Sequence, residues 1–125
     1  MIQKWIKDQL KVAIPNLEWT YDYKTGKDHT GVVYHETPGQ ISRDDLEIIT
    51  PSYSVYIETS DMKNAEKWAW IVYDTMNKRR QEVATIDDRS FQIIFIEVTT
   101  PPILVGIEDK KMTYSINLTA TIRKI

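Results

Sequence analysis

The last part of the chain carries the most regular pattern in the sequence. Apolar and polar residues alternate without interruption over residues 112–122, and the apolar set is Met112, Tyr114, Ile116, Leu118, Ala120 and Ile122. A period of two places every apolar side chain on one face of an extended strand. The sequence therefore predicts a long strand with one buried face, and another layer of the same domain must cover that face.

Several other segments have the patterns of strands. Residues 18–23 alternate, and residues 31–35 form the expected return strand of a hairpin that turns at the polar segment 24–28. Residues 52–59 alternate as well. Residues 91–98 are almost continuously apolar, which is typical of a central strand covered on both faces. After Pro101 and Pro102 the strand pattern resumes over residues 103–107.

Two segments have the period of an amphipathic helix. The first has an apolar stripe made by Ile2, Trp5, Ile6, Leu10 and Ala13, and Pro15 ends it. The second has a stripe made by Ala65, Trp68, Ala69, Val72 and Met76. We expect Ser60 or Asp61 to cap this second helix, and Lys78, Arg79 and Arg80 to close it at the negative end of its dipole.

The order of these elements predicts the fold class. Strands grouped around only two helices indicate a single α+β domain over residues 1–125, with an antiparallel-rich mixed β-sheet and both main helices packed on it. A length of 125 residues is that of one domain. Residues 40–51 have a weak pattern, and they form either a long connecting arm or a short strand at 47–50.

Composition excludes several classes of site. The chain has no cysteine, which excludes a disulfide scaffold, a thiolate zinc site and a cysteine nucleophile. A formal net charge of -2 weakens the case for a nucleic-acid-binding protein. No apolar run approaches the roughly 20 residues that cross a bilayer, and the amino terminus lacks the apolar stretch of a signal peptide. We therefore expect no contact with a membrane.

The residue types that carry catalysis or metal binding are not clustered in the sequence. The two histidines, His29 and His35, have a spacing that fits no standard metal site. No serine has the context of a nucleophile, and the four glycines are too dispersed for a phosphate loop. The acidic pairs lack a calcium-loop pattern and are expected to be solvated turns; they are residues 44–45, 87–88 and 108–109. The sequence predicts no catalytic residues, no metal site and no cofactor.

The residues expected at the surface say more about function than the residue types that carry catalysis or metal binding. Trp70 lies off the apolar stripe of its helix, and Tyr56 lies on the polar side of its strand. Leu46 and Ile48 are apolar residues within the 40–51 arm. Exposed aromatic residues and an extended arm are typical of assembly subunits, so we expect these four residues at an interface between copies. The strand at 112–122 is also available for pairing if it lies at the edge of the sheet.

In the order of its elements and in several local sequence segments, the chain resembles the small tail-terminator and minor-capsid (head–tail joining) proteins of tailed bacteriophages. One matching segment is the end of the early aromatic hairpin, residues 32–39 (VVYHETPG). Another is residues 53–58 (YSVYIE), which run directly into a helix containing residues 71–74 (IVYD). A third is residues 101–109 (PPILVGIED), followed by a charged turn and a long terminal strand.

The resemblance implies a virion protein of the tail or neck, assembled in the cytoplasm of the bacterial host. Its subunits close into a ring, commonly of six copies, that caps the tail tube, stops its polymerisation and provides the head–tail joining surface. The implied partners are other copies of the chain, the tail tube protein, and head connector or sheath and neck proteins. DNA only passes through the lumen, and the family has no cofactor and no catalytic residues.

Three alternatives remain open from the sequence. The first is a head-completion or connector (stopper) protein of the neck. The second is a small ligand-binding or enzymatic α+β domain. The third is a nucleic-acid-binding module in which Lys78, Arg79 and Arg80 contact phosphates or face a DNA-containing lumen. The neighbouring Glu82, Asp87 and Asp88 would dilute such a basic patch.

Overall fold

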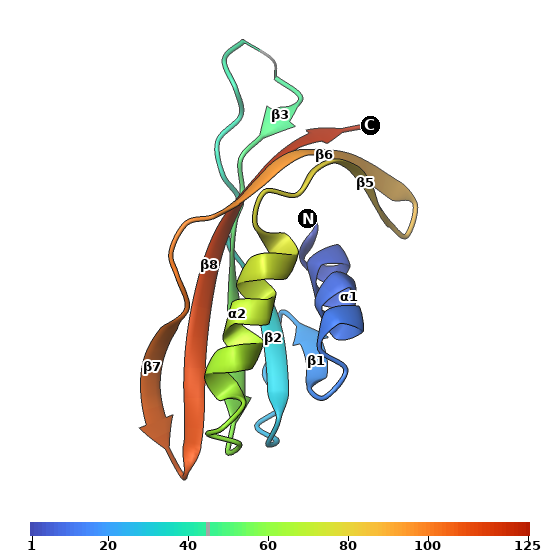
Figure 1. Ribbon diagram of the computed structural model, residues 1–125. Coiled ribbons are helices and arrows are strands. Elements are labelled where there is room, and N and C mark those ends of the chain that lie inside the picture. The colour runs from blue at the N-terminus through green and yellow to red at the C-terminus, as the bar shows by residue number, and fades with distance from the viewer. Residues whose placement is uncertain (45) are drawn as a thin grey trace.

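A computed structural model describes residues 1–44 and 46–125, and it has two helices and an eight-stranded mixed sheet (Figure 1). The elements in chain order are α1 (Gln3–Ala13), β1 (Glu18–Tyr21), β2 (Thr30–Thr37), β3 (Ile48–Ile49), β4 (Ser52–Thr59), α2 (Ala65–Met76), β5 (Arg80–Ile86), β6 (Arg89–Val98), β7 (Ile103–Glu108) and β8 (Lys111–Lys124). Among the described strands, all pairs but one are antiparallel. The predicted α+β class is confirmed.

Strand β8 lies in the middle of the sheet, whose main order is β1-β2-β4-β8-β6-β5. One edge of β8 pairs with β4 and then with the short β3. The other edge pairs with β7 near its start and with β6 near its end. The predicted strand at 112–122 is therefore present, but it is not an edge strand and is not available to a partner.

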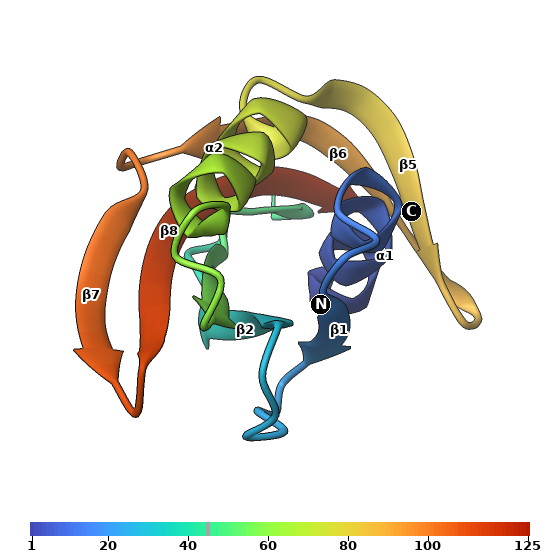
Figure 2. The same cartoon turned by 60° about the horizontal axis from the view of Figure 1, so that its bottom comes forward.

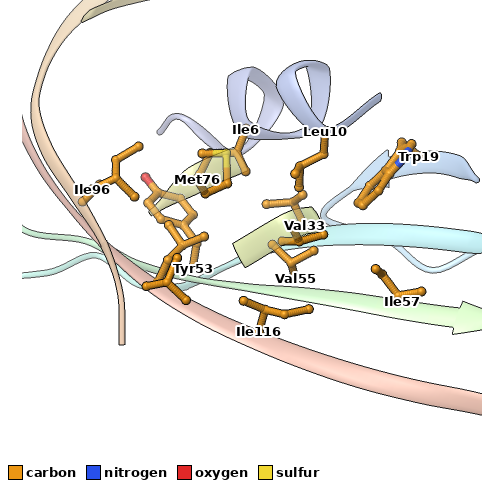
Figure 3. Close-up of a cluster of buried hydrophobic side chains, with 14 of the residues drawn as sticks. Ile6, Leu10, Trp19, Val33, Tyr53, Val55, Ile57, Met76, Ile96 and Ile116 are labelled. Carbon is orange, nitrogen blue, oxygen red and sulfur yellow. The ribbon is translucent and has the colours of Figure 1, made fainter. Parts of the chain in front are cut away.

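Both helices pack on one face of the sheet, and the sheet curves around them (Figure 2). Ile6 and Leu10 of α1 and Met76 of α2 meet Val33, Val55 and Ile116 of the sheet in one buried cluster (Figure 3). Both predicted apolar stripes thus point into the core. Burial of these side chains supplies most of the favourable free energy of folding.

The predicted hairpin at residues 18–35 is wrong, because β1 and β2 are parallel. The segment between them crosses over instead of turning back. Asp22 and His29, at the two ends of the crossing, have φ angles of 66° and 56°, a left-handed conformation that redirects the chain. Trp19 of β1 then packs on Gly31 of β2, and its indole N–H donates to the carbonyl of Ile14 at 2.9 Å.

The second helix is shorter than predicted at both ends. It begins at Ala65, and the Asp61 carboxylate accepts the N–H of Asn64 one residue before it. It ends at Met76, and Lys78 has a φ angle of 65°. Lys78, Arg79 and Arg80 therefore do not form the last helical turn, and Arg80 begins β5, a strand that the sequence pattern did not predict.

Strand β6 is covered on one face, not on both as its apolar run predicted. Phe91, Ile93, Ile96 and Val98 are buried, whereas Gln92 and Glu97 are exposed. A register shift between Ile93 and Phe95 moves the buried set from odd to even positions. The extra residue of this bulge makes a one-sided strand read as a continuous apolar run.

The contact between Trp19 and Gly31 gives a prediction about stability. A Cβ atom on Gly31 would overlap the six-membered ring of Trp19, whereas a Cβ on Gly106 would meet nothing within 4 Å. Gly31→Ala should lower the free energy of unfolding by about 1–3 kcal/mol through overpacking, and Gly106→Ala should leave it nearly unchanged. Urea denaturation measures both, and equal midpoints for the two variants would contradict this packing.

The Asp28 carboxylate links the β1–β2 crossing to the start of the α2 region. It accepts hydrogen bonds from the Ser60 hydroxyl, from the Ser60 N–H at 2.9 Å and from the His29 N–H at 2.8 Å. The Ser60 hydroxyl contributes most, and together these bonds lower the pKa of Asp28 to about 2 from 3.8. The ionised form is thus favoured by folding.

This depressed pKa predicts a pH dependence of stability. The contribution of Asp28 is fully present above pH 4 and is lost as the pH falls through about 2, since the unfolded chain protonates first. Asp28→Asn should therefore be less stable than the native chain above pH 4, and the difference should shrink towards pH 2. Thermal unfolding between pH 2 and pH 6 measures it, and parallel profiles would contradict the assignment.

Candidate assembly surfaces

Strand β7 exposes all of its residues, although four of them are large and apolar. They are Ile103, Leu104, Val105 and Ile107, and Val105 is 60% exposed. Pro101 and Pro102 precede this strand: they have no N–H to donate, and the ladder that β6 makes with β8 stops before them and resumes at Ile103. Beyond this break β7 lies outside α2, and Figures 1 and 2 show neither helix over it.

Trp70 lies on the same flank of α2 as Glu66 and Tyr73. Glu66, Trp70 and Tyr73 follow one another at helical spacing, and the two rings pack at 5.2 Å between centroids. Burial raises the pKa of Tyr114 and the charge of Glu66 raises it further, so this flank lies near Tyr114. Tyr114 is opposite Leu104 in the β7–β8 ladder. We call Trp70, Tyr73 and the four apolar residues of β7 together the β7 surface. Leu104 and Ile107 lie on the helix face of the sheet, opposite Tyr114 and Met112, whereas Ile103 lies on the other face, opposite Ser115.

The outer edges of the sheet differ in how well they are protected against pairing with a strand of another molecule. Strand β1 is only four residues long, and β5 carries Arg80 and Glu82 on its edge. Short length and charge are two common ways to prevent unwanted pairing at a sheet edge. Strand β7 has six residues with a charge only at Glu108, and none of the described strands pairs with its outer edge. Its one protection is the bulge between Leu104 and Gly106.

The arm at residues 40–51 projects from the other end of the sheet (Figure 1). Of the two predicted alternatives the short strand is present, because Ile48–Ile49 forms β3 on Ile122 and Arg123 of β8. Ile48 is half-buried in this pairing, whereas Leu46 is 75% exposed and Ile41 is 60% exposed. Asp45 lies outside the described residues.

Tyr56 lies on the face of the sheet that the helices leave open. Its ring packs edge-on against Tyr34 at 5.9 Å, and both line a hollow of about 260 Å³ with Val32. At its rim Glu58 is paired with Lys24 at 2.7 Å and lies 3.9 Å from Lys111. The predicted interface residues are therefore not brought together: Trp70 is on the helix face, Tyr56 on the open face, and Leu46 and Ile48 at the far end.

The three basic residues do not form a basic patch. The guanidinium of Arg79 donates to Glu82 and, at 2.9 Å, to Gln9, and it stacks over the Trp5 ring at 5.0 Å. Its hydrogen bond to Glu82 lowers the pKa of that carboxyl. Arg79 thus joins α1 to β5, while Lys78 and Arg80 are exposed on either side. A phosphate contact by all three residues at once is not supported by this arrangement.

The histidines pack within the fold, and the described residues of the acidic pairs are exposed. His35 stacks on the buried Tyr53 at 5.0 Å, and His29 lies 2.7 Å from the Thr59 hydroxyl. Asp87, in the β5–β6 turn, pairs with Lys4 at 3.6 Å. Within residues 1–44 and 46–125, no group of three or more His, Asp or Glu side chains could hold a metal ion. No helix in these ranges is long and apolar enough to span a membrane.

Comparison with known proteins gives a fold and no function. No protein-family profile matches the chain, and no curated protein sequence does. One solved structure, of a protein whose name states no function, is similar with a TM-score of 0.60 and 17% identity. The similarity covers 98% of this chain and 90% of that chain. At this identity the likeness shows a shared fold alone.

The two tryptophans of α2 allow a matched test of the β7 surface. Trp68 is buried in the core, whereas Trp70 is 41% exposed and contacts Tyr73. Trp68→Ala should lower the free energy of unfolding by about 3–5 kcal/mol. Trp70→Ala should lower it by about 1 kcal/mol, the value of an exposed aromatic pair. A large loss of stability in the Trp70 variant would make that residue part of the core and not of a surface.

Proposed function

We propose that this chain is a structural subunit of the tail or neck of a phage or phage-tail-like particle. Its copies close into a ring on the tail tube, end tube polymerisation and present the head–tail joining surface. The observation that carries the proposal is the presence of two different exposed apolar regions at opposite ends of one small domain. These are the β7 surface and the arm with Ile41 and Leu46.

Two different patches on one subunit are what a ring requires. A head-to-tail interface joins one patch to the other patch of the next copy, and it closes when the rotation between copies is right. Exposed apolar side chains that gather on one surface typically mark protein–protein contacts. In this chain one patch lies at the start of β8 and the other at its end. A subunit can therefore use both patches at once.

The sequence resemblance supports the specific role. The segments 32–39, 53–58 and 101–109 carry the likeness to tail terminators and minor-capsid proteins, and the last of them contains β7. In this role the protein is a virion component and not an enzyme. Its partners are further copies of itself, the tail tube protein and the connector or other neck proteins, and DNA only traverses the lumen.

A second candidate is a small ligand-binding domain. The hollow beside Tyr34 and Tyr56, which we call the tyrosine hollow, favours it. Val32, Tyr34 and Tyr56 form its apolar lining beside the charged pair of Lys24 and Glu58. Its volume of about 260 Å³ is slightly below the range of about 300–1,000 Å³ that holds typical small ligands. The ring proposal accounts for the β7 surface and the arm, which a ligand-binding monomer leaves unexplained.

The test is assembly on tail tubes. The purified chain is examined by native mass spectrometry, and by negative-stain microscopy with tubes formed from the tube protein identified in the neighbouring reading frames. We expect a ring of defined mass, density at one end of each tube and an arrest of tube growth. Rings that bind empty heads but not tubes would indicate the stopper role instead. A chain that stays monomeric and leaves tube length unchanged would contradict the proposal.

A further inference from the structure

We propose that the arm of one copy adds as a strand to the free edge of β7 in the next copy. The interface would then be a β-sheet that runs continuously from one subunit into its neighbour. This inference deepens the proposed ring and rests on it in taking a second copy of the chain as the partner. The acceptor edge, the donor segment and their charges each support it.

The acceptor is the outer edge of β7. An edge strand presents a row of backbone N–H and C=O groups that another strand can pair with. Strand β7 has no internal proline and no lysine, and its one charged residue, Glu108, is at its end. Its exposed side chains supply apolar surface for the added strand to bury. This edge is thus suited to strand addition.

The donor is the outgoing side of the arm, residues 40–44. Around Ile41 it is paired along one edge, since the Ser42 N–H donates to the Ile48 carbonyl at 2.9 Å and the Thr50 N–H donates to the Gln40 carbonyl at 3.1 Å, and the chain then bends at Arg43 and Asp44. Ile41 bridges to Ile49 within this ladder. Because one edge of the segment is held by the arm itself, its other edge is ordered for a partner at little further cost in conformational entropy.

Charge and spacing indicate a parallel register. Arg43 follows Ile41 by two residues, where the arm begins to bend, and Glu108 follows Gly106 by two residues on one face of β7. Parallel addition with Ile41 beside Gly106 brings Arg43 near Glu108. Gly106 leaves open space for the Ile41 side chain. Glu108 has Lys111 opposite it and Lys24 nearby, but across the described part of the chain neither Arg43 nor Glu108 is in an ion pair within 4 Å.

The two regions cannot meet within one subunit. The arm pairs with β8 at Ile122, whereas Gly106 pairs with Thr113. At about 3.3 Å per residue these positions lie roughly 30 Å apart along β8. The arm must therefore reach another copy, and each copy can donate and accept simultaneously. Pairing of β7 with a second β7 would instead use the same edge twice and stop at a dimer.

Disulfide trapping tests this register, and the absence of native cysteine makes it specific. The double variant Ile41→Cys/Gly106→Cys should give a ladder of covalent oligomers up to the ring size under mild oxidation, because neighbouring strands meet the distance that a disulfide needs. The matched control is Ile41→Cys/Val83→Cys, since Val83 is exposed on the edge of β5. The control should stay monomeric on a non-reducing gel.

Charge reversal tests the same contact without oxidation. Arg43→Glu should weaken self-association about tenfold, and adding Glu108→Arg should restore it, because the pair is re-formed with opposite signs. Arg43→Lys should retain most of the association. Circular dichroism of each variant checks that the fold is unchanged. Equal weakening in the single and double reversal variants would overturn the proposed ion pair.

The outcomes separate this inference from the proposed function. If the protein forms rings that cap tubes, but the double cysteine variant gives no series of covalent oligomers, the inference is overturned and the proposed function stands. A series of covalent oligomers from a protein that never caps tubes would support the inference and contradict the proposed function. Covalent dimers from Gly106→Cys alone, with no longer species in the double variant, would replace arm addition by β7–β7 pairing. No cross-linking in any variant, even with tubes present, would overturn strand addition.

Discussion

The fold depends on β8, because almost the whole length of this strand is paired along both of its edges. Strands β4 and β3 share one edge, and β7 and β6 share the other. The two helices cover the sheet over the core but not over β7. The same strand thus holds the core together and carries β7 and the arm at its two ends. The separation of these two surfaces follows from the length of β8.

Much of the fold could be predicted from side-chain periodicity. The alternation at 112–122 and the two helical stripes correspond to β8, α1 and α2, with Trp19, Trp68 and Tyr53 buried as expected. The pairing of β1 with β2 could not be predicted, because the crossing depends on left-handed backbone at Asp22 and His29 rather than on apolar pattern. Strand β5 was missed because its edge is charged. The bulge in β6 makes the sequence of a strand with one buried face look continuously apolar.

The candidate site was only partly predictable. Trp70 is exposed, as its position off the helical stripe indicates, and the arm contains the short strand that was one of two alternatives. The exposure of β7 was missed, because an apolar run such as ILVGI suggests core. Pro101 and Pro102 before it were the available signal, since they interrupt the pairing along β8 before β7 begins. The tyrosine hollow could not be predicted, because it brings together residues distant in sequence, among them the paired Lys24 and Glu58.

The central claim is that the outer edge of β7 becomes paired when copies of the chain assemble. Hydrogen–deuterium exchange tests it most directly, because amide protection reports the hydrogen bonding of each strand. Assembled and monomeric protein should differ in residues 103–108 and 40–44, where exchange slows on assembly, while β5 exchanges equally in both. Unchanged exchange in residues 103–108 of the assembled ring would contradict the account.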